Sequence, residues 1–209
     1  MSLQDNISEK ISTSSTDHFE IKGYLEDDEA LWYLKKILNM AYDFKTFTVK
    51  GKKIRLHLIA LGIGGSNLLN LSIKEPYFKK TLAIIDGDTS IQTKHKNAIK
   101  LPTPLKEKCN PETTIYEYIK GIADGKEARY KESAKKLIEI NRATNTVLRE
   151  KILSLGNISN RDTAKSWIKK AKSSIEQYEI FTYFQKDFKQ QLDTFKNQLE
   201  NKLHELVCK

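Results

Sequence analysis

The chain has 209 residues, of which 39% are hydrophobic and 30% are charged, values that are ordinary for a globular protein. No stretch approaches the roughly 20 consecutive apolar residues that a membrane-spanning helix needs. Residues 1–17 are polar and rich in Ser and Thr, and they lack the apolar core of a signal peptide. The composition therefore argues against a membrane protein and predicts a cytoplasmic one without a membrane partner.

The net charge of +9 is unevenly distributed: residues 1–119 carry +2 and residues 120–209 carry +7. A basic excess is compatible with a polyanionic partner, because cations that neutralise phosphates release counterions. A lysine-rich solvated helix face is the more common cause of such an excess. The two cysteines have no metal-like spacing and the four histidines are scattered, so neither residue type indicates a metal site.

In chain order, the first two predicted elements meet at an acidic cluster. Phe19–Leu25 alternates apolar and polar residues, which predicts a strand. Ala30–Leu38 repeats apolar residues at helical spacing, and the acidic run Glu26–Glu29 before it favours the positive end of a helix dipole. A second strand, Ile54–Leu61, runs into the glycine turn Gly62–Gly65, and a short helix follows it.

The next predicted elements complete an α/β pattern. Thr81–Ile85 is continuously aliphatic, as in parallel strands that are covered on both faces, and it ends at Asp86-Gly-Asp88. Asn97–Leu101 is a fourth, weaker strand, and the run from Asn110 to Glu112 opens another helix with Pro in its first turn. Alternating strands and helices predict a mostly parallel four-stranded sheet flanked by helices, of the Rossmann-like class.

From Ile115 onward the apolar residues recur at helical spacing, which predicts an all-helical C-terminal extension. Its final segment, Tyr178 to about Leu206, is expected to form one long amphipathic helix or a bent pair. Gly121, Gly125 and Gly156 are the expected breaks. The predicted organisation is a flexible tail (residues 1–17), an α/β domain (18–125) and a helical region (126–209).

The predicted strand ends bring two acidic clusters to one edge of the sheet. In open α/β sheets functional groups collect at the carboxyl ends of the strands, and Glu26–Glu29 and Asp86–Asp88 both lie there. Gly87 lets the backbone turn, so that the Asp86 and Asp88 carboxylates reach the same edge. Carboxylates are the ligands that Mg²⁺ prefers, so the sequence predicts a Mg²⁺ or Mn²⁺ site. A polar Asp-Gly-Asp turn without a metal ion is the alternative.

The glycine turn after the second strand has two interpretations. It is not a P-loop, because no GxxxxGK[ST] occurs in the chain, and Asn67 stands at the sixth position of a GxGxxG. A tight strand-to-helix turn is one interpretation. The other is that backbone N–H groups of Gly62, Gly64, Gly65 and Ser66 bind a substrate phosphate.

Several of these segments together resemble TOPRIM domains. Tyr24–Ala30 resembles their first motif, a strand that ends in a glutamate, and Ile84–Asp88 resembles their DxD motif. Ala60–Asn67 is similar to the glycine turn between them. Ile99–Pro102 and Asn110–Thr113 resemble a continuation found in the overcoming-lysogenization-defect (OLD) group of ATPase-linked TOPRIM nucleases. The resemblance covers about residues 19–119, with a looser echo in residues 184–203.

The resemblance implies roles for the acidic residues. Glu26 corresponds to the family glutamate, a metal ligand or general base, and Asp86 and Asp88 correspond to the metal-binding aspartates. A second acidic residue is expected one helical turn after the glutamate, where this chain has Ala30. A complete second metal site is therefore in doubt.

The same resemblance points to further candidate residues. Asp27 and Glu29 are the candidates to replace the missing second acidic residue as metal ligands. A C-terminal lysine is also expected to assist the substrate phosphate, and Lys186 is the candidate for it.

By resemblance, the expected function is Mg²⁺- or Mn²⁺-dependent cleavage of nucleic acid, DNA above all, in an OLD-like nuclease or phage-defence system. The family's ATPase half with its P-loop is missing from this sequence, so the resemblance implies a fragment or a stand-alone protein, with an ATPase domain or subunit as a partner. Nucleotidyl transfer at the same site is a second hypothesis. The third is a catalytically degenerate module that binds nucleic acid or docks a partner ATPase. A homo-oligomer is compatible with the helical region.

Overall fold

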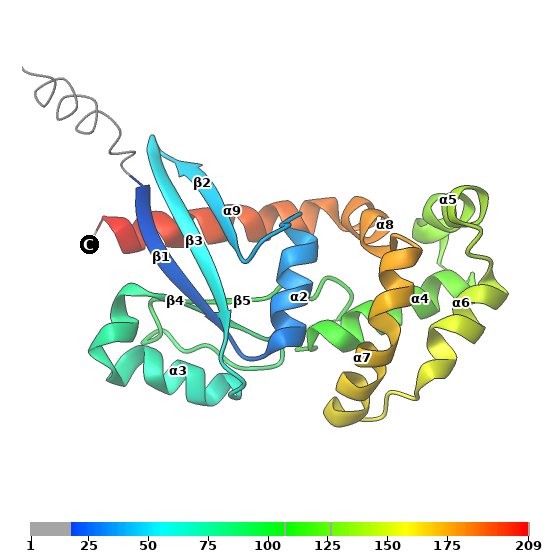
Figure 1. Ribbon diagram of the computed structural model, residues 1–209, viewed down its shortest axis with the longest axis horizontal. Helices are drawn as coiled ribbons and strands as arrows, with labels where there is room; N and C mark the ends of the chain where they lie inside the picture. The colour runs from blue at the N-terminus through cyan, green and yellow to red at the C-terminus, as the bar shows by residue number, and fades with distance from the viewer. Residues whose placement is uncertain (1–17, 107, 126, 209) are drawn as a thin grey trace, which may run out of the picture.

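The computed structural model describes residues 18–106, 108–125 and 127–208, so the predicted tail of residues 1–17 lies outside the described residues. Figure 1 shows the strands at one end of the molecule and most helices at the other. The strands are β1 (His18–Leu25), β2 (Phe44–Val49), β3 (Lys52–Ala60), β4 (Leu82–Ile85) and β5 (Ala98–Lys100). The α-helices are α2 (Asp28–Ile37), α3 (Gly65–Lys74), α4 (Pro111–Asp124), α5 (Lys131–Asn141), α6 (Asn145–Lys151), α7 (Arg161–Gln177), α8 (Ile180–Asp187) and α9 (Lys189–Val207). Short 3-10 turns are η1 (Pro76–Lys80), η2 (Ala128–Tyr130) and η3 (Leu153–Leu155).

The strands form one mixed sheet in the order β2-β3-β1-β4-β5. Four strands, β3, β1, β4 and β5, are parallel to their neighbours in this group, as the sequence predicted. The fifth strand, β2, pairs antiparallel with β3 at the edge of the sheet. The α/β class is therefore confirmed, whereas the prediction of four strands was wrong.

Strand β2 exists because the chain makes a tight hairpin before β3. Phe44–Val49 alternates outward and inward residues, and only Phe47 and Val49 are buried. Lys50 and Gly51 connect the two strands with φ angles of 47° and 78°, the left-handed conformation that two-residue hairpin turns require. The Lys-Gly pair after an alternating β-branched and aromatic segment is the sequence signal for this hairpin.

Helices cover both faces of the sheet. Leu25 and Leu56 point to the face that packs against α2, α4 and the C-terminal helices. Tyr24 and Ile85 point to the opposite face, which packs against Leu68 and its neighbours in α3. Since adjacent residues of a strand point to opposite faces, each face has its own apolar cluster.

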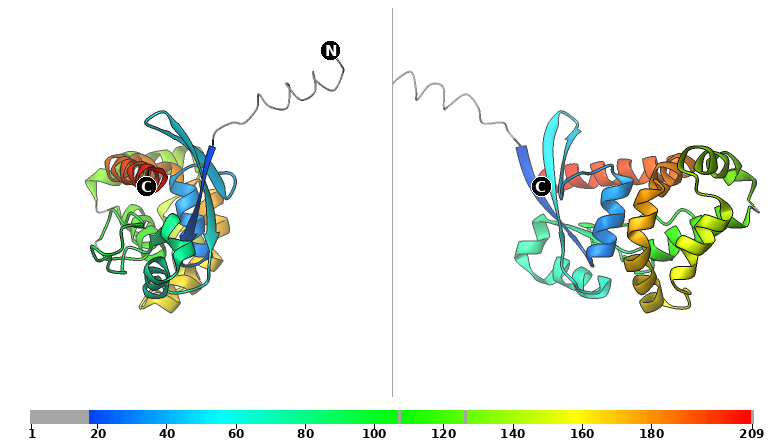
Figure 2. Two further views of the ribbon diagram at one scale, coloured as in Figure 1. Left: turned by 90° about the vertical axis from the view of Figure 1, so that its left-hand side faces the viewer. Right: turned by 45° about the vertical axis from the view of Figure 1, so that its right-hand side comes forward.

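The C-terminal helices return to the sheet. Helix α9 contacts β2 and β5, and Figure 2 shows it running back from the helical end to lie beside the strands. Of the two forms predicted for the final segment, one long helix or a bent pair, the structure has the bent pair, α8 and α9, which meet at Phe188. The ring of Phe181 packs edge-on against Trp32 and Tyr33 of α2, with centroids 5.1 and 5.9 Å apart. No helix among the described residues is long and apolar enough to cross a membrane.

Of the predicted glycine breaks, Gly125 ends a helix and Gly121 does not. Gly125 ends α4 in the left-handed conformation, with φ of 63°, as helix-terminating glycines commonly do. Gly121 lies inside α4, so its prediction as a break was wrong. A Cβ atom at position 121 would stand 2.8 Å from Cε2 of Tyr130, so the glycine is needed for ring packing on the helix.

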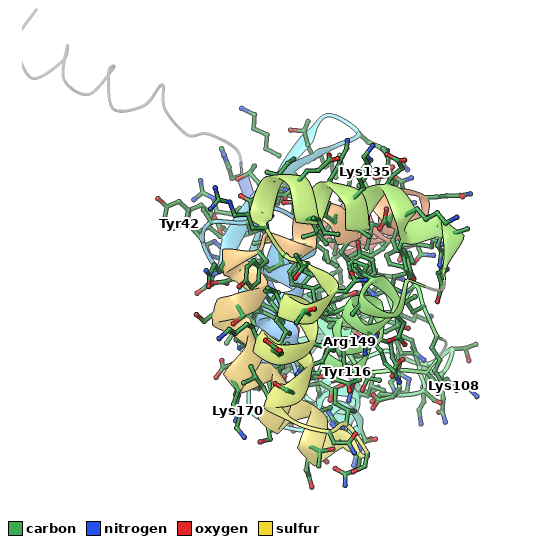
Figure 3. All side chains as sticks on the ribbon, turned by 90° about the vertical axis from the view of Figure 1, so that its right-hand side faces the viewer. Tyr42, Lys108, Tyr116, Lys135, Arg149 and Lys170 are labelled. Carbon is green, nitrogen blue, oxygen red and sulfur yellow. The ribbon has the colours of Figure 1, made fainter. Side chains whose placement is uncertain are left out.

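Trp167 anchors α7 against the rest of the helical end. It is 1% exposed, its Nε1 donates a hydrogen bond to the Ile152 carbonyl at 2.9 Å, and Tyr116 packs edge-on against it at 5.1 Å. Figure 3 shows this end of the molecule and labels the half-buried Tyr116 and the exposed Lys170 of α7.

We therefore expect Trp167→Ala to lower the free energy of unfolding by about 3–5 kcal/mol, because it deletes a large buried side chain and leaves a cavity. Urea denaturation of the two proteins measures this difference. Lys170→Ala, on the exposed face of the same helix, should change stability by no more than about 0.5 kcal/mol. Equal effects of the two substitutions would contradict the anchoring role.

Candidate functional site

Glu26 and Asp86 meet at the carboxyl ends of adjacent parallel strands. Leu25 of β1 pairs with Ile84 of β4, so the residues that follow the two strands emerge side by side. Both carboxylates are 1% exposed, and the Asp86 N–H donates a hydrogen bond to Glu26 Oε1 at 2.9 Å. The structure thus brings together two of the three residues that the sequence assigned to the principal metal site.

An arginine that is distant in sequence faces this carboxylate pair. Arg161 Nη2 donates to Glu26 Oε2 at 2.9 Å and to Asp86 Oδ2 at 3.4 Å. Arg161 is the first residue of α7, and 39% of its side chain is exposed. The guanidinium group therefore covers the carboxylate pair on the side toward solvent.

Burial and neighbouring acidic residues shift the pKa of Asp86. Burial, as the largest cause, and the negative charges of Glu26, Glu112, Asp27 and Asp88 together raise its pKa to about 9. Asp86 Oδ1 is buried without a hydrogen-bond partner. A carboxyl group in this setting is protonated at neutral pH unless an additional cation approaches it.

Asp88 lies at the exposed side of the same cluster. Its charge acts on both Asp86 and Arg161, raising the pKa of each as a smaller contribution beside the larger ones. The Asp88 side chain therefore lies near the buried pair and is open to solvent.

The predicted glycine turn packs directly on Glu26. The Ile63 N–H donates to the Glu26 carbonyl at 2.9 Å, and α3 begins at Gly65 immediately afterwards. A Cβ atom at position 65 would stand 2.3 Å from Glu26 Oε1, which is impossible without movement of the carboxylate. Gly62, with φ of 68°, and Gly64 and Ser66 are exposed beside it.

A second acidic group lies beside the first. Asp27 caps α2 by accepting from the Ala30 N–H through Oδ1 at 2.9 Å, while Oδ2 accepts from Lys165 Nζ. Burial alone would raise the pKa of Asp27, but the Lys165 ammonium and the Ala30 N–H overcome burial and lower it. Glu29 is buried on the same helix, and its Oε1 lies 3.7 Å from Lys172 Nζ.

Glu112 completes this second group from the first turn of α4. It is 2% exposed, and neither carboxylate oxygen has a hydrogen-bond partner. Burial is the main reason that the pKa of Glu112 is raised to about 7; the charges of Asp27 and Glu29 also raise it, whereas its own backbone N–H and Lys165 lower it. Like Asp86, it is a buried acid whose charge is not fully compensated.

The cations facing both groups lie on one face of α7. Arg161, Lys165 and Lys172 are four and seven residues apart, which is the spacing of a helix stripe. The helix begins at Asn160 with a capping box that includes Thr163. These cations were not predicted from the sequence, although a basic stripe directly after a capping residue is a signal for them.

The N-termini of four helices also lie near the acidic residues. Asp27 caps α2 and Gly65 is the first residue of α3. Glu112 lies in the first turn of α4, and Arg161 is the first residue of α7. The positive ends of helix dipoles favour anions at such a point.

Lys186 does not lie beside the Glu26–Asp86 pair. It is an exposed residue of α8, next to Gln185, which binds the Lys36 carbonyl and Asn39 at the C-terminal end of α2. The Glu26 cluster is at the opposite end of that helix. Among residues 18–106, 108–125 and 127–208, no three His, Cys, Asp or Glu side chains are arranged to hold a metal ion, and the α7 cations face the carboxylates instead.

Gly65→Ala tests whether the turn positions Glu26. We expect the added methyl group to displace the Glu26 carboxylate and to weaken Mn²⁺ binding at least about tenfold, which corresponds to about 1.4 kcal/mol. Mn²⁺ titration followed by electron paramagnetic resonance measures this change. Gly64→Ala is the matched control, because a Cβ atom there meets no atom within 4 Å. Equal binding by both variants would show that the close approach is unimportant.

Comparison of the chain with protein-family models, with curated proteins and with solved structures finds no match.

Proposed function

We propose that this chain is a divalent-cation-dependent phosphodiesterase that cleaves nucleic acid, DNA above all, with a TOPRIM-like domain of the OLD type. The observation that carries the proposal is the buried Glu26–Asp86 pair at the carboxyl ends of adjacent parallel strands, with Asp86 Oδ1 unpartnered. Two buried carboxyl groups side by side favour a bound cation, which lets both ionise. The positive helix ends around them favour a phosphate group.

The proposed ion is a single Mg²⁺ or Mn²⁺ at two buried carboxylates, because no three His, Cys, Asp or Glu side chains of the described residues are arranged to hold a metal ion. Glu26 and Asp86 would hold it, with Asp88 at the exposed side, because carboxylates and water are the ligands that these ions prefer. The Arg161 guanidinium contacts both buried carboxylates and supplies the positive charge that a metal ion would supply at this position. When bound, the ion would polarise the scissile phosphate and lower the pKa of a coordinated water molecule.

The chain's own cations then bind the substrate. Arg161 is released from the carboxylates when their charge is otherwise balanced, and its planar guanidinium can bind a phosphate through two hydrogen bonds. The exposed residues Gly62, Gly64 and Ser66 of the glycine turn would supply further backbone donors to the phosphate. The net charge of +7 in residues 120–209 favours the binding of a polyanion.

Cleavage assays with end-labelled oligonucleotides test the proposal. Single- and double-stranded DNA and RNA are incubated with Mg²⁺, Mn²⁺ or EDTA. We expect cleavage only with a metal ion, and a loss of about 100-fold or more in Glu26→Gln, equivalent to about 3 kcal/mol of transition-state stabilisation. Asp162→Asn, an exposed acidic residue of α7, is the control that should retain activity. EDTA-resistant cleavage, or full activity in Glu26→Gln, would refute the assignment.

A second candidate function is supported by the α7 cations. Arg161 and Lys165 already neutralise part of the acidic cluster, as a catalytically degenerate module that binds nucleic acid or docks a partner ATPase would allow. Such a module should bind oligonucleotides equally well with Mg²⁺ and with EDTA, and cleave none of them. Metal-dependent cleavage decides between the two candidates.

A further inference from the structure

Part of one face of the sheet is left uncovered by the described residues. Helix α3 packs on Tyr24, Ile85 and their neighbours, on the β4 side of this face. Helix α9 contacts β2 from the opposite face, and Figure 1 shows β1 and β3 crossing in front of it. What remains is an open sheet face of exposed and half-buried side chains on β1, β2 and β3: Glu20, Lys22, Phe44, Thr46, Thr48, Lys53, Arg55 and His57.

An aromatic ring stands at each end of one row of side chains across the open sheet face. Phe44 pairs with His57, and His57 pairs with Lys22, so these three residues lie side by side on adjacent strands. Lys22 Nζ lies 5.3 Å from the centroid of the Tyr77 ring and donates a hydrogen bond to its hydroxyl at 2.6 Å. At the other end, Tyr42 stacks on Phe44 with ring planes at 12° and centroids 5.5 Å apart. The rings at both ends are exposed, so a flat ligand can reach them.

The charge of the open sheet face is positive. Its cations are Lys22, Lys53 and Arg55, and its acidic residue is Glu20. Glu20 Oε1 lies 3.6 Å from Arg55 Nη1, so it offsets part of this charge. Arg55 Cζ also lies 5.6 Å from the centroid of the Phe44 ring. The face therefore presents flat rings directly beside groups that attract phosphate.

A hollow beside this row has room for a ligand. Its volume is about 420 Å³, a size at which proteins bind small organic groups, and it is lined by Phe44, His57 and Ile59 among others. Asp43 lines it too, but its carboxylate is paired with Lys35 at 2.5 Å. Bases that stack on aromatic side chains, with cations along the phosphates, are the usual way in which proteins hold a single strand of nucleic acid. Exposed aromatic residues on an open sheet are one form of that arrangement.

We propose that the open sheet face binds single-stranded nucleic acid, with bases stacked on Tyr42 and Phe44 and phosphates held by Lys22, Lys53 and Arg55. The paired bases of a duplex are stacked on one another and cannot use these rings.

The open sheet face is continuous with the candidate site. The carboxyl end of β3 leads into the glycine turn, where the Ile63 N–H donates to the Glu26 carbonyl. A strand that lies along β3 is thereby led toward the Glu26–Asp86 pair. The inference rests on the proposed function for what happens to the strand there, whereas the binding itself needs no metal ion.

Fluorescence anisotropy of a dye-labelled single-stranded oligonucleotide in EDTA tests the stacking. We expect Phe44→Leu to bind at least about fivefold more weakly than the wild type, because it removes a ring on which a base stacks. Phe19→Leu is the matched control. Phe19 is 41% exposed against 44% for Phe44 and also lies under a cation, Lys52 at 5.2 Å, but it points to the opposite face of the sheet. It should bind within about twofold of the wild type. Equal affinities of the two variants would overturn the inference.

The salt dependence of binding tests the phosphate contacts. The logarithm of the binding constant falls with the logarithm of the salt concentration, by about 0.7 for each phosphate that a single strand has neutralised. Lys53→Met should reduce this slope by about 0.7, and Lys52→Met, on the neighbouring residue that points to the opposite face, should leave it unchanged. If Phe44→Leu does not fold, this comparison and Tyr42→Leu decide, since Tyr42 is 68% exposed. An unchanged slope in Lys53→Met would count against the proposed contacts.

The same variants separate this inference from the proposed function. If the strand binds through Phe44 in EDTA but is not cleaved with Mn²⁺, the proposed function fails and the inference stands. If Mn²⁺-dependent cleavage occurs while Phe44→Leu binds as tightly as the wild type, the inference alone fails. Light scattering tests a second copy of the chain as the occupant: a wild-type dimer that Phe44→Leu dissociates, without binding of the oligonucleotide, would overturn the inference.

Discussion

Asp86→Asn should make the metal-free protein more stable at pH 8 and inactive as a phosphodiesterase. The substitution removes a buried acid that lies beside Glu26 and whose Oδ1 has no hydrogen-bond partner. We expect a gain of at least about 1 kcal/mol, which raises the melting temperature by about 2–4 °C for a chain of this size. Cleavage should fall about 100-fold or more, because the same group is needed to hold the cation.

A substitution that raises stability and lowers activity indicates a residue that is needed for function and that destabilises the folded protein. Differential scanning calorimetry and the oligonucleotide assay measure both effects on one preparation. Asp162→Asn controls for the loss of one negative charge on the surface and should change neither. A melting temperature that falls in Asp86→Asn would indicate that the carboxylate mainly stabilises the fold through Arg161.

The stability of the metal-free protein should decrease as the pH rises from about 5 to 9. Asp86 and Glu112 have folded-state pKa values of about 9 and about 7, above their ordinary values of 3.8 and 4.5. A raised folded-state pKa contributes stability that is complete below the ordinary value and is lost as the pH passes through the folded value. Glu112 should therefore lose its contribution by about pH 7, and Asp86 by about pH 9.

Melting temperatures at unit steps of pH measure this dependence, in EDTA and again with Mn²⁺. Asp27 has the opposite effect on the pH dependence of stability, because its pKa is lowered in the folded chain. The stability that it adds is lost only in acid, below the range from pH 5 to 9. Asp86→Asn/Glu112→Gln should flatten the curve, and Mn²⁺ should oppose the decrease at high pH by binding the folded chain. A melting temperature of the wild type that rises from pH 5 to 9 in EDTA would contradict the raised pKa values of these buried acids.

The meeting of Glu26 and Asp86 was predictable from local patterns. Each follows a short apolar strand, and parallel strands deliver their carboxyl ends to one edge of the sheet. The hairpin strand β2 carried a local signal too, in its alternating residues and Lys50-Gly51 turn, but only Phe47 and Val49 are buried, so its apolar pattern is short.

The α7 cations were not predictable in the same way. Arg161 is 135 residues from Glu26, and its approach depends on how α4, α5 and α6 fold the chain back on itself. Glu112 stands in the first turn of a helix, where an acidic residue is ordinary because of the helix dipole, so nothing local indicates that it is buried. Lys186 was inferred by resemblance alone, and the described structure places it at the far end of α2 from the carboxylates.

Calorimetric titration of Mn²⁺ into the wild-type chain, Glu26→Gln and Asp86→Asn tests the central claim most directly. We expect saturable binding of one ion per wild-type chain and a loss of affinity of at least about tenfold, or about 1.4 kcal/mol, in each variant. Absence of saturable binding in the wild type, or unchanged isotherms in both variants, would contradict it.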